Sequence, residues 1–284
     1  EVTGEALALD AEGRPRFVMH TYVAYLGVGQ KTPETFFVTC DAECFDASSW
    51  STHKISDQIW RSSTLRFDDA GAIHLATVAR VVGEDASTTE LGAYLTCASD
   101  CTSDAGWTGT GLIPAYSNEL EAVAMKPAIS MELAAGGAPR VALMAADGFD
   151  KNLVYFACDA GCDGPDAWRG TILSDLQSMN AGLDLALDEQ GRPRIAHTVD
   201  YNIGVAFCDA ADCTLEGSPW ELAKVEVASE MDPDEIFLWD NCNVGAWFLH
   251  SPSLALDAAG RPRVGYQARD ISGGFSNQIG RAHV

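Results

Sequence analysis

Aromatic, acidic and basic side chains that could hold a polar ligand gather in one stretch of the sequence, residues 226–251. This stretch contains Trp239, Asp240, Trp247 and His250. Aromatic rings beside carboxylates suit stacking on a sugar ring while its hydroxyls are hydrogen-bonded. We therefore expect both tryptophans to stack on a ligand, His250 to donate to it and Asp240 to accept from it. The alternative is a long surface loop whose aromatic side chains only cover the protein beneath them.

Two shorter segments add candidates for the same ligand. Residues 59–63 contain Trp60, which could stack, and Arg61, which could donate; Glu119, farther along the chain, could accept. Glu119 and Asp240 could instead act as the acid and base of a glycoside hydrolase or lyase. Such an enzyme needs two carboxylates roughly 5–9.5 Å apart. A sequence does not give that distance, so both hypotheses stay open.

Eight of the nine cysteines form four pairs in which three or four residues separate the two sulfur-bearing positions. The pairs are Cys40/Cys44, Cys97/Cys101, Cys158/Cys162 and Cys208/Cys213. Tetrahedral zinc needs four ligands at one point, whereas these pairs are spread along the chain and no histidine recurs beside them. They are therefore predicted to be disulfides, which indicates an oxidising compartment. Cys242 is left over and could be a buried thiol, a ligand or a link to another chain.

The chain is strongly acidic, with 41 Asp and Glu against 18 Lys and Arg, a net charge of −23. Such a protein repels polyphosphate and anionic lipid headgroups, so neither nucleic acid nor a membrane is expected as a partner. No uncharged apolar run approaches the roughly 18 residues of a membrane-spanning helix. Together with the cysteines and a first residue, Glu1, that is not methionine, this predicts a processed protein that is secreted, periplasmic or exposed at the cell surface.

A ten-residue motif, Leu-Ala-Leu-Asp-x-x-Gly-Arg-Pro-Arg, recurs along the chain and indicates its architecture. Full or weaker copies occupy residues 7–16, 65–71, 131–140, 185–194 and 254–263. In chain order the second copy lacks the Pro-Arg pair, and the third has Ala134 where the others have aspartate. The glycine suits the positive φ of a bulged hairpin turn. The periodic arginines and aspartates are expected to pair with each other and not with a ligand.

Each unit is predicted to be a four-stranded β-meander. One strand ends at the Asp-x-x-Gly turn, a second apolar strand follows, a third ends at the first cysteine of a pair, and the tryptophan segment after the pair forms the fourth. The sequence therefore predicts an all-β fold, a β-propeller of about five four-stranded blades. Four of the blades carry a short Cys-x3-Cys or Cys-x4-Cys disulfide loop. An elongated solenoid is the alternative.

Residues 1–284 are predicted to form one propeller domain. Its units cover about 5–60, 61–122, 123–178, 179–222 and 250–284, with a divergent insertion at 223–251. The fifth unit lacks an outer strand, which Glu1–Gly4 could supply from the N-terminus and so fasten a closed ring. The alternatives are a last blade of three strands or a longer native chain.

The repeat resembles that of secreted bacterial propellers with sialidase-like blades, Ser-Leu-Ala-Leu-Asp-x-x-Gly-x-Pro. The match is clearest at 252–263, and Ser103–Trp107 looks like a sialidase Asp-box, although it lies at a cysteine loop and occurs once. The resemblance implies the fold and little about activity, because propellers host lectins, hydrolases, lyases and scaffolds. It also implies that loops entering the innermost strands meet at the mouth of a central channel. The divergent segments fall in those loops, at residues 59–63, 117–121, 175–180 and 226–251.

Other chemistries find less support. His20 and His197 occupy nearly the same place in two units, but their offset of one residue points them to opposite faces of a strand, against a shared copper or zinc site. No Gly-x-Ser-x-Gly elbow is present, so no Ser-His-Asp triad is assigned. No cofactor is expected, with calcium the one exception considered. The run Asp232-Pro-Asp-Glu235 could hold calcium, although it lacks the spacing of a known calcium loop.

These observations predict a secreted or cell-surface binding module that recognises a glycan or a small polar ligand at the channel mouth. Another surface protein is a further candidate partner. One alternative is the carbohydrate-active hydrolase or lyase that would use Glu119 and Asp240. The other is a structural envelope or filament protein in which Cys242 and the unfinished fifth unit mediate contacts.

Overall fold

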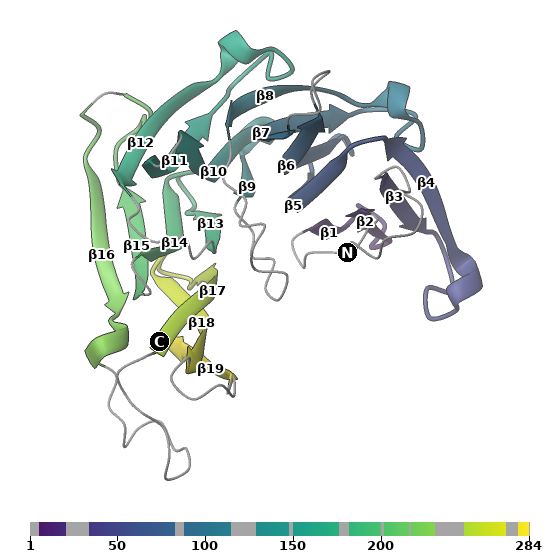
Figure 1. Cartoon of the computed structure of the whole chain (residues 1–284). Helices are drawn as coiled ribbons and strands as arrows, with labels where there is room; N and C mark the ends of the chain where they lie inside the picture. The colour runs from purple at the N-terminus through teal and green to yellow at the C-terminus, as the bar shows by residue number, and fades with distance from the viewer. Residues whose placement is uncertain are drawn as a thin grey trace.

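The residues that the structure describes form five antiparallel β-sheets, which follow one another in sequence order and are called blades 1–5. The computed structural model describes residues 6–20, 34–82, 88–114, 129–147, 150–175, 182–199, 202–215, 217–230, 247–270 and 278–283. Strands within each blade are hydrogen-bonded in chain order, so each blade is a meander (Figure 1). The all-β prediction is confirmed. In the described ranges no helix is long and apolar enough to cross a membrane.

Four of the blades have four described strands and the last has three. Blade 1 comprises β1 (Leu7–Leu9), β2 (Pro15–His20), β3 (Thr35–Cys40) and β4 (Trp50–Ser56); blade 2 comprises β5 (Ile59–Phe67), β6 (Ile73–Val82), β7 (Thr88–Cys97) and β8 (Thr108–Pro114). Blade 3 comprises β9 (Ile129–Ala134), β10 (Ala138–Asp147), β11 (Asp150–Ala157) and β12 (Arg169–Asp175). Blade 4 comprises β13 (Leu183–Leu187), β14 (Pro193–Val199), β15 (Asn202–Cys208) and β16 (Trp220–Glu226), and blade 5 comprises β17 (Trp247–Leu256), β18 (Pro262–Asp270) and β19 (Gln278–His283).

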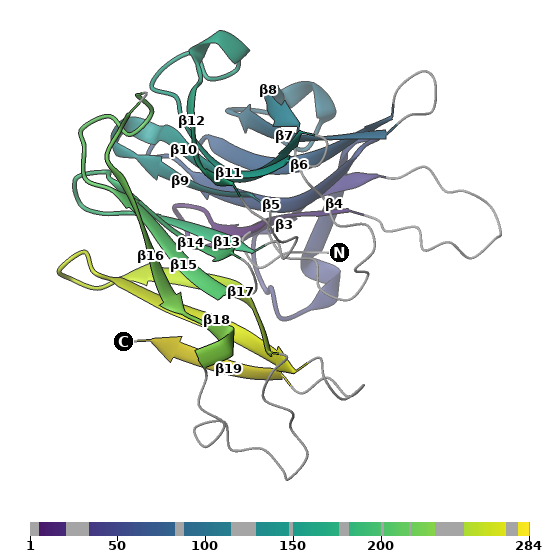
Figure 2. The same ribbon diagram turned by 60° about the vertical axis from the view of Figure 1, so that its left-hand side comes forward.

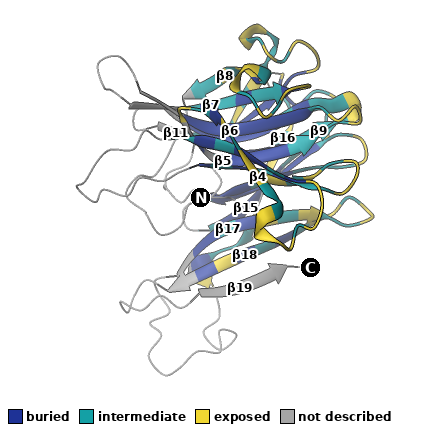
Figure 3. Cartoon of the chain, turned by 90° about the vertical axis from the view of Figure 1, so that its right-hand side faces the viewer, coloured by how far each residue is buried: buried dark blue, intermediate teal, exposed yellow. Residues whose placement is uncertain are grey.

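The blades are arranged around a common centre. Figure 1 shows the first strand of each blade nearest this centre and the strands β4, β8, β12 and β16 on the outside. Buried apolar residues fill the spaces between neighbouring blades, in one cluster between blades 1 and 2, one through blades 2, 3 and 4, and one between blades 4 and 5. The hairpin turns and disulfide loops project from one side of the molecule, where exposed residues concentrate (Figure 3).

The aspartate and glycine of the motif shape the first hairpin of a blade. In blade 1, Asp10 Oδ1 accepts hydrogen bonds from the backbone N–H groups of Glu12 and Arg14 at 3.1 and 2.8 Å. Gly13 takes a φ of 75°, a conformation that side chains with a Cβ rarely adopt. The same turn glycine has a positive φ in every blade, at Gly13, Gly71, Gly137, Gly191 and Gly260. The positive φ inferred from the sequence is therefore confirmed.

The second arginine of the motif ties this turn to the disulfide loop of the same blade. In blade 4, Arg194 donates to the carbonyl oxygen of Cys208 at 3.0 Å. Its guanidinium also pairs with Asp188 of the turn at 3.2 Å and with Asp209 of the loop at 2.5 Å. Arg16 makes the corresponding three contacts in blade 1. The periodic arginines are thus engaged within the repeat, as the sequence predicted.

All four predicted disulfides form, between Cys40 and Cys44, Cys97 and Cys101, Cys158 and Cys162, and Cys208 and Cys213. The tryptophan that follows each disulfide donates its indole N–H to the carbonyl oxygen of the second cysteine, as Trp168 does to Cys162 at 2.9 Å. This bond fixes the position of the ring relative to its loop.

The same tryptophans join neighbouring blades. Their rings pack edge-on against an aromatic residue of the preceding blade, in the pairs Phe37–Trp107, Tyr94–Trp168 and Tyr155–Trp220, with ring centroids 5.8, 5.0 and 5.3 Å apart. Trp50, in the first blade, contacts Phe17 of its own blade at 5.5 Å instead. The blade tryptophans are packing residues, as the repeat indicated.

Polar contacts between innermost strands link blades 3, 4 and 5. Ser130 Oγ on β9 accepts from the N–H of Leu185 on β13 at 3.1 Å. Asp184 Oδ2 on β13 accepts from the N–H of Leu254 on β17 at 2.6 Å. Burial raises the pKa of Asp184 despite these hydrogen bonds. One side chain of β9 and one of β13 therefore bind the backbone of the next blade.

The five blades form an open arc. Blade 1, in purple, and blade 5, in yellow, stand at its two ends in Figure 1, and Figure 2 shows blade 5 beyond blade 4 at the end of the series. The closed ring expected from the repeat is thus not observed among the described residues, and the strand that Glu1–Gly4 could supply lies outside them. Closure depends on the angle between blades, which side-chain sizes in the interfaces set and a turn motif does not encode. The ends of the predicted insertion, 223–251, belong to β16 and β17.

The interblade aromatic pairs predict that replacing two equivalent tryptophans by alanine lowers the free energy of unfolding by different amounts. Trp168→Ala removes the contact with Tyr94 and opens the space between blades 2 and 3, so we expect it to lower the free energy of unfolding by about 3–5 kcal/mol. Trp50→Ala, the matched control, loses only a contact inside blade 1 and should cost clearly less. Urea unfolding with the disulfides intact measures both, and equal losses would contradict the interblade role.

Candidate functional site

Most of the side chains predicted to bind a ligand lie beyond what the structure describes. Glu119, Trp239 and Asp240 fall outside the described residues, as do Cys242 and the run 232–235 considered for calcium. Arg61 lies on β5 and Trp247 begins β17, but their side chains are not described. The roles assigned to these residues remain predictions.

Trp60 is placed in the core. Its side chain is buried between blades 1 and 2, with its ring centroid 6.1 Å from that of Trp107. Its backbone N–H donates to Thr35 Oγ1 at 3.1 Å. The predicted stacking of Trp60 on a ligand is therefore replaced by a packing role, because neighbouring side chains cover both faces of a ring in this position.

His250 is buried next to an irregularity of the innermost strand of blade 5. Its Nδ1 lies 3.0 Å from Ser251 Oγ, and Ser251 has a φ of 50°. The strand pairing shifts between His250 and Ser253. Blade 2 has the same irregularity after Arg61, where Ser62 has a φ of 48°. Two predicted donors thus occupy equivalent positions at bulges, a relation that the sequence motif did not reveal.

His20 and His197 lie in different blades and face different neighbours. His197 follows Ile195 by two residues, and Ile195 packs against blade 3; His20 follows Val18, which packs against blade 2. Residues two apart share a face of a strand, so the two rings point into separate interfaces. In the described part of the chain, no group of three His, Cys, Asp or Glu side chains is placed to hold a metal ion.

A groove of about 990 Å³ opens between blades 3 and 4 on the side of the turns and disulfide loops. Its walls are the first hairpin turns of both blades and their disulfide loops, and its lining reaches the buried Tyr155. Its volume is at the upper end of the roughly 300–1,000 Å³ range of ligand pockets.

The groove lies where the repeat is interrupted. In blade 4, Asp188 begins the turn and its Oδ2 pairs with Arg192 and Arg194 at 2.7 and 3.2 Å. Blade 3 has Ala134 in place of this aspartate and Ala138 in place of the first arginine. A Cβ at the glycine of the next turn would lie 3.9 Å from Ala134 Cβ, so this position faces blade 4. Alanine at position 134, in place of the aspartate, leaves this space open.

A row of alternating arginines and aspartates crosses the groove from blade 3 to blade 4. Arg140, which has no turn carboxylate in its own blade, donates to Asp159 Oδ1 at 2.7 Å. Arg169 donates to Asp159 Oδ2 at 2.6 Å and to Asp212 Oδ2 at 2.7 Å. Arg169 and Asp159 have side-chain exposures of 47% and 58%, so a ligand can reach them. Each group is held by charged partners and is preorganised for binding.

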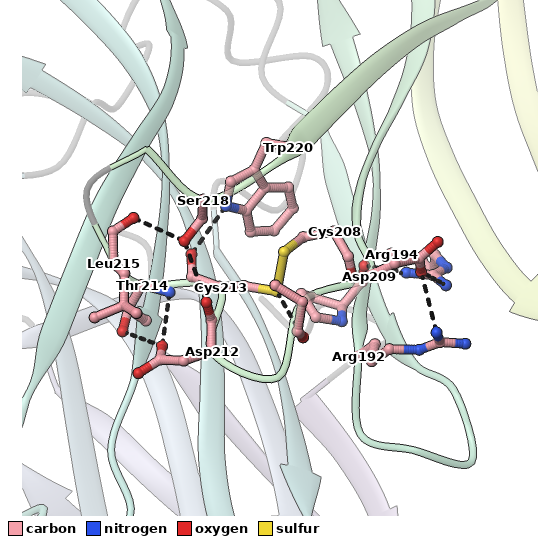
Figure 4. The surroundings of a disulfide bond; sticks show 12 residues. Arg192, Arg194, Cys208, Asp209, Asp212, Cys213, Thr214, Leu215, Ser218 and Trp220 are labelled. Carbon is pink, nitrogen blue, oxygen red and sulfur yellow. Dashed lines mark hydrogen bonds and ion pairs between the residues drawn. A yellow bond between two sulfur atoms is a disulfide. The ribbon is translucent and has the colours of Figure 1, made fainter.

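The blade 4 wall of the groove is built around the disulfide Cys208–Cys213 (Figure 4). Thr214 donates to Asp212 Oδ1 from its backbone N–H at 2.9 Å and from its hydroxyl at 2.6 Å. These hydrogen bonds from Thr214 hold the pKa of Asp212 below its usual value. Asp212 is therefore an ionised acceptor at neutral pH and not a proton donor.

Sequence analysis predicted other ligand-binding residues than those of the groove. It gave the arginines and aspartates of the turns a purely structural role. That assignment holds in blades 1 and 4, where the ion pairs are complete. The available signal was Ala134, the one turn position at which aspartate is missing. A row that depends on Arg169 and Asp212, which belong to different blades, cannot be read from a motif within one unit.

No protein-family model and no curated protein matches this sequence. Solved structures match its fold. One is an ulvan lyase, a polysaccharide lyase bound to GlcA(1-4)Rha3S, with 9% identity, a TM-score of 0.50, and coverage of 98% of this chain and 69% of the lyase. The chain has a β-propeller fold.

Two further solved structures are similar at lower scores. The endo-arabinase from Bacteroides thetaiotaomicron is 10% identical over 98% of this chain and 92% of its own, with a TM-score of 0.46. A sialidase from Streptococcus pneumoniae is 9% identical over 87% of this chain and 35% of its own, with a TM-score of 0.47. At these identities the propeller likeness concerns architecture, and chemistry has to be argued from the groove.

His197 lies in the propeller core. His197 is 1% exposed, and neither ring nitrogen has a hydrogen-bond partner among the residues described. Its ring lies where a Cβ at Gly204 would come within 3.1 Å. Burial lowers the pKa of His197 from 6.5 to about 4. The unfolded chain therefore binds a proton that the folded chain rejects between these pH values.

This histidine predicts acid sensitivity. As pH falls from about 6.5 to about 4, protonation of His197 in the unfolded chain should remove on the order of 3 kcal/mol of stability. His197→Leu, which copies Leu143 of blade 3, should lack this part of the loss. Urea unfolding between pH 7 and pH 4 compares the two proteins, with His53→Leu on the outer strand β4 as control. Parallel stability curves for wild type and His197→Leu would refute the assignment.

Proposed function

We propose that this propeller is a glycan-binding module that acts outside the cytoplasm and holds a neutral glycan or small polar ligand in the groove between blades 3 and 4. The observation that carries this proposal is the Arg140–Asp159–Arg169–Asp212 row, exposed at the one turn where the repeat loses its aspartate. Fixed carboxylates and guanidinium groups offer both acceptors and donors to ligand hydroxyls.

Charge supports a neutral ligand over an acidic one. Six carboxylates and three arginines line the groove, and the whole chain carries a net charge of −23. Like charges disfavour a sulfated or uronate-containing glycan. The acidic unit bound by the ulvan lyase is therefore a poor guide to the ligand of this chain.

Disulfides support the location. Four bridges form within the blades, and such bonds persist in oxidising compartments and not in the cytosol. Glycans outside the cell or in its envelope are then the accessible ligands.

Binding is favoured over catalysis at this groove. A glycoside hydrolase needs a carboxylic acid whose pKa is raised so that it can protonate the leaving oxygen. Asp212 has a lowered pKa, and Asp159 is held between two arginines. The hydrolase hypothesis thus rests on Glu119 and Asp240 alone, and a structural role through Cys242 likewise rests on a residue outside the described ranges.

Restoring the repeat should abolish binding. Ala134→Asp/Ala138→Arg recreates the Asp188–Arg192 pair in blade 3 and fills the groove, so we expect neutral glycans that bind wild type on an array to be lost while stability is kept or increased. Arg169→Ala should weaken calorimetric affinity roughly tenfold or more. Arg14→Ala, which breaks the same kind of ion pair in blade 1, should not change it.

A third variant separates the two candidate sites. Trp247→Ala should leave affinity unchanged if the groove is the site. Loss of binding in Trp247→Ala, with full binding by the blade 3 double variant, would reject the groove in favour of the channel mouth. A wild-type protein that binds no neutral glycan, or that binds sulfated glycans better, would reject the proposed ligand class.

A further inference from the structure

The interfaces that follow blades 2, 3 and 4 share one rule of sidedness. On the innermost strand, the first leucine position of the motif, three residues before the position of the turn aspartate, faces the preceding blade. Leu65, Met131 and Leu185 occupy this position in blades 2, 3 and 4 and are 0, 0 and 1% exposed. On the second strand, a small residue faces the following blade. That residue is Ala76, Ala142 and Ala196 in blades 2, 3 and 4, each 0% exposed. From blade 3 onward, a large side chain of one blade thus meets a small one of the blade before it, whereas Leu65 of blade 2 packs in one cluster with Val18 of blade 1.

Blade 1 presents the large half of this interface, and the described residues place no blade in front of it. Leu7, equivalent to Leu185, is 47% exposed, and Leu9 is 61% exposed. Phe17 and Met19 on β2 share this face by their spacing and are partly exposed. Figure 1 places β1 and β2 at one end of the arc. The residues equivalent to Leu7 in blades 2, 3 and 4, where a preceding blade exists, are at most 1% exposed.

Blade 5 presents the small half, and no blade lies behind it in the part of the chain that the structure describes. Gly265 stands at the position of Ala196, and the flanking Ser253, Ala255 and Gln267 are exposed. Thr198, the blade 4 equivalent of Gln267, is 2% exposed because blade 5 covers it. The vacant face of blade 5 therefore has the same small, partly polar character as the occupied face of blade 4.

The residue positions that make hydrogen bonds between inner strands also recur at the two ends of the arc. Ser130 accepts from the N–H of Leu185, and Asp184 accepts from the N–H of Leu254. Ser253 is the next residue of the acceptor series, and Leu7 is the residue equivalent to the donors Leu185 and Leu254. Shape and polarity thus match at the two free faces.

We propose that blade 5 of one molecule docks on blade 1 of a second copy, continuing the interface that joins blades 1–5. Within one molecule the two faces stand at opposite ends of the arc (Figure 1), and four buried interfaces fix that separation. A second copy meets no such constraint. The contact is heterologous, so two molecules pair reciprocally or the series grows.

Light scattering with size-exclusion chromatography on the full chain tests this docking. Wild type should shift with concentration from 30.3 kDa to at least twice that mass. Leu7→Glu and Gly265→Glu should each stay monomeric, because each places an unpaired charge in a buried contact. Leu222→Glu on β16, where the leucine is 48% exposed, is the matched control and should associate like wild type. Leu9→Glu is a second blade 1 variant at a more exposed position.

Mixing the Leu7→Glu and Gly265→Glu proteins tests most directly whether blade 5 docks on blade 1. Leu7→Glu keeps an intact blade 5 face and Gly265→Glu keeps an intact blade 1 face, so an equimolar mixture should form a 1:1 heterodimer and stop there. Formation of this heterodimer also shows that both variants are folded. A wild type that is monomeric at every concentration, association that survives Leu7→Glu and Leu9→Glu, or a mixture without heterodimer would each overturn the proposal.

Discussion

The packing of a disulfide-loop tryptophan on an aromatic ring of the preceding blade holds the outer half of this propeller together. The disulfide shapes the loop, the indole N–H fixes the ring against that loop, and the ring then reaches across the interface, as Trp168 does to Tyr94. Nearer the axis, Ser130 and Asp184 bind the backbone of the next blade. The orientation of the blades therefore depends on contacts between units, and each unit supplies one of the two partners in such a contact.

The candidate site likewise lies between two units and is built from residues of both. In a complete repeat the turn aspartate pairs with the motif arginines and neutralises their charge. Few hydrogen-bonding groups of the turn are then left for a ligand. Ala134 and Ala138 remove that neutralisation in blade 3. Arg140 keeps the contact with the loop aspartate, Asp159, that Arg16 and Arg194 also make in their blades, and Asp159 pairs with Arg169 as well. The resulting row ends on Asp212 of blade 4. A ligand site can thus arise when alanine replaces charged residues of a structural motif. The ion pairs that remain then hold the binding groups in place before a ligand arrives.

The repeat motif allowed the strands, the positive-φ glycines, the disulfides and the packing role of the blade tryptophans to be predicted, because each of these is a property of one unit. The open arc could not be predicted, since the angle between blades depends on interface side chains such as Ala196 and Leu254. Trp60 was assigned to a ligand because its segment diverges from the motif, but divergence also occurs where a core between two blades is filled. Ala134 was visible as an exception, yet its meaning required Arg169 and Asp212, which lie in other parts of the chain. The channel-mouth residues Glu119, Asp240 and Trp247 remain predictions.

The central claim is that the interrupted turn of blade 3 creates the ligand site. A crystal structure of the protein with a neutral oligosaccharide identified on an array tests this most directly. The account predicts sugar density in the groove between blades 3 and 4, with hydroxyls within hydrogen-bond distance of Asp159, Arg169 and Asp212. Sugar density confined to the loops at the other side of the propeller, with an empty groove, would contradict it.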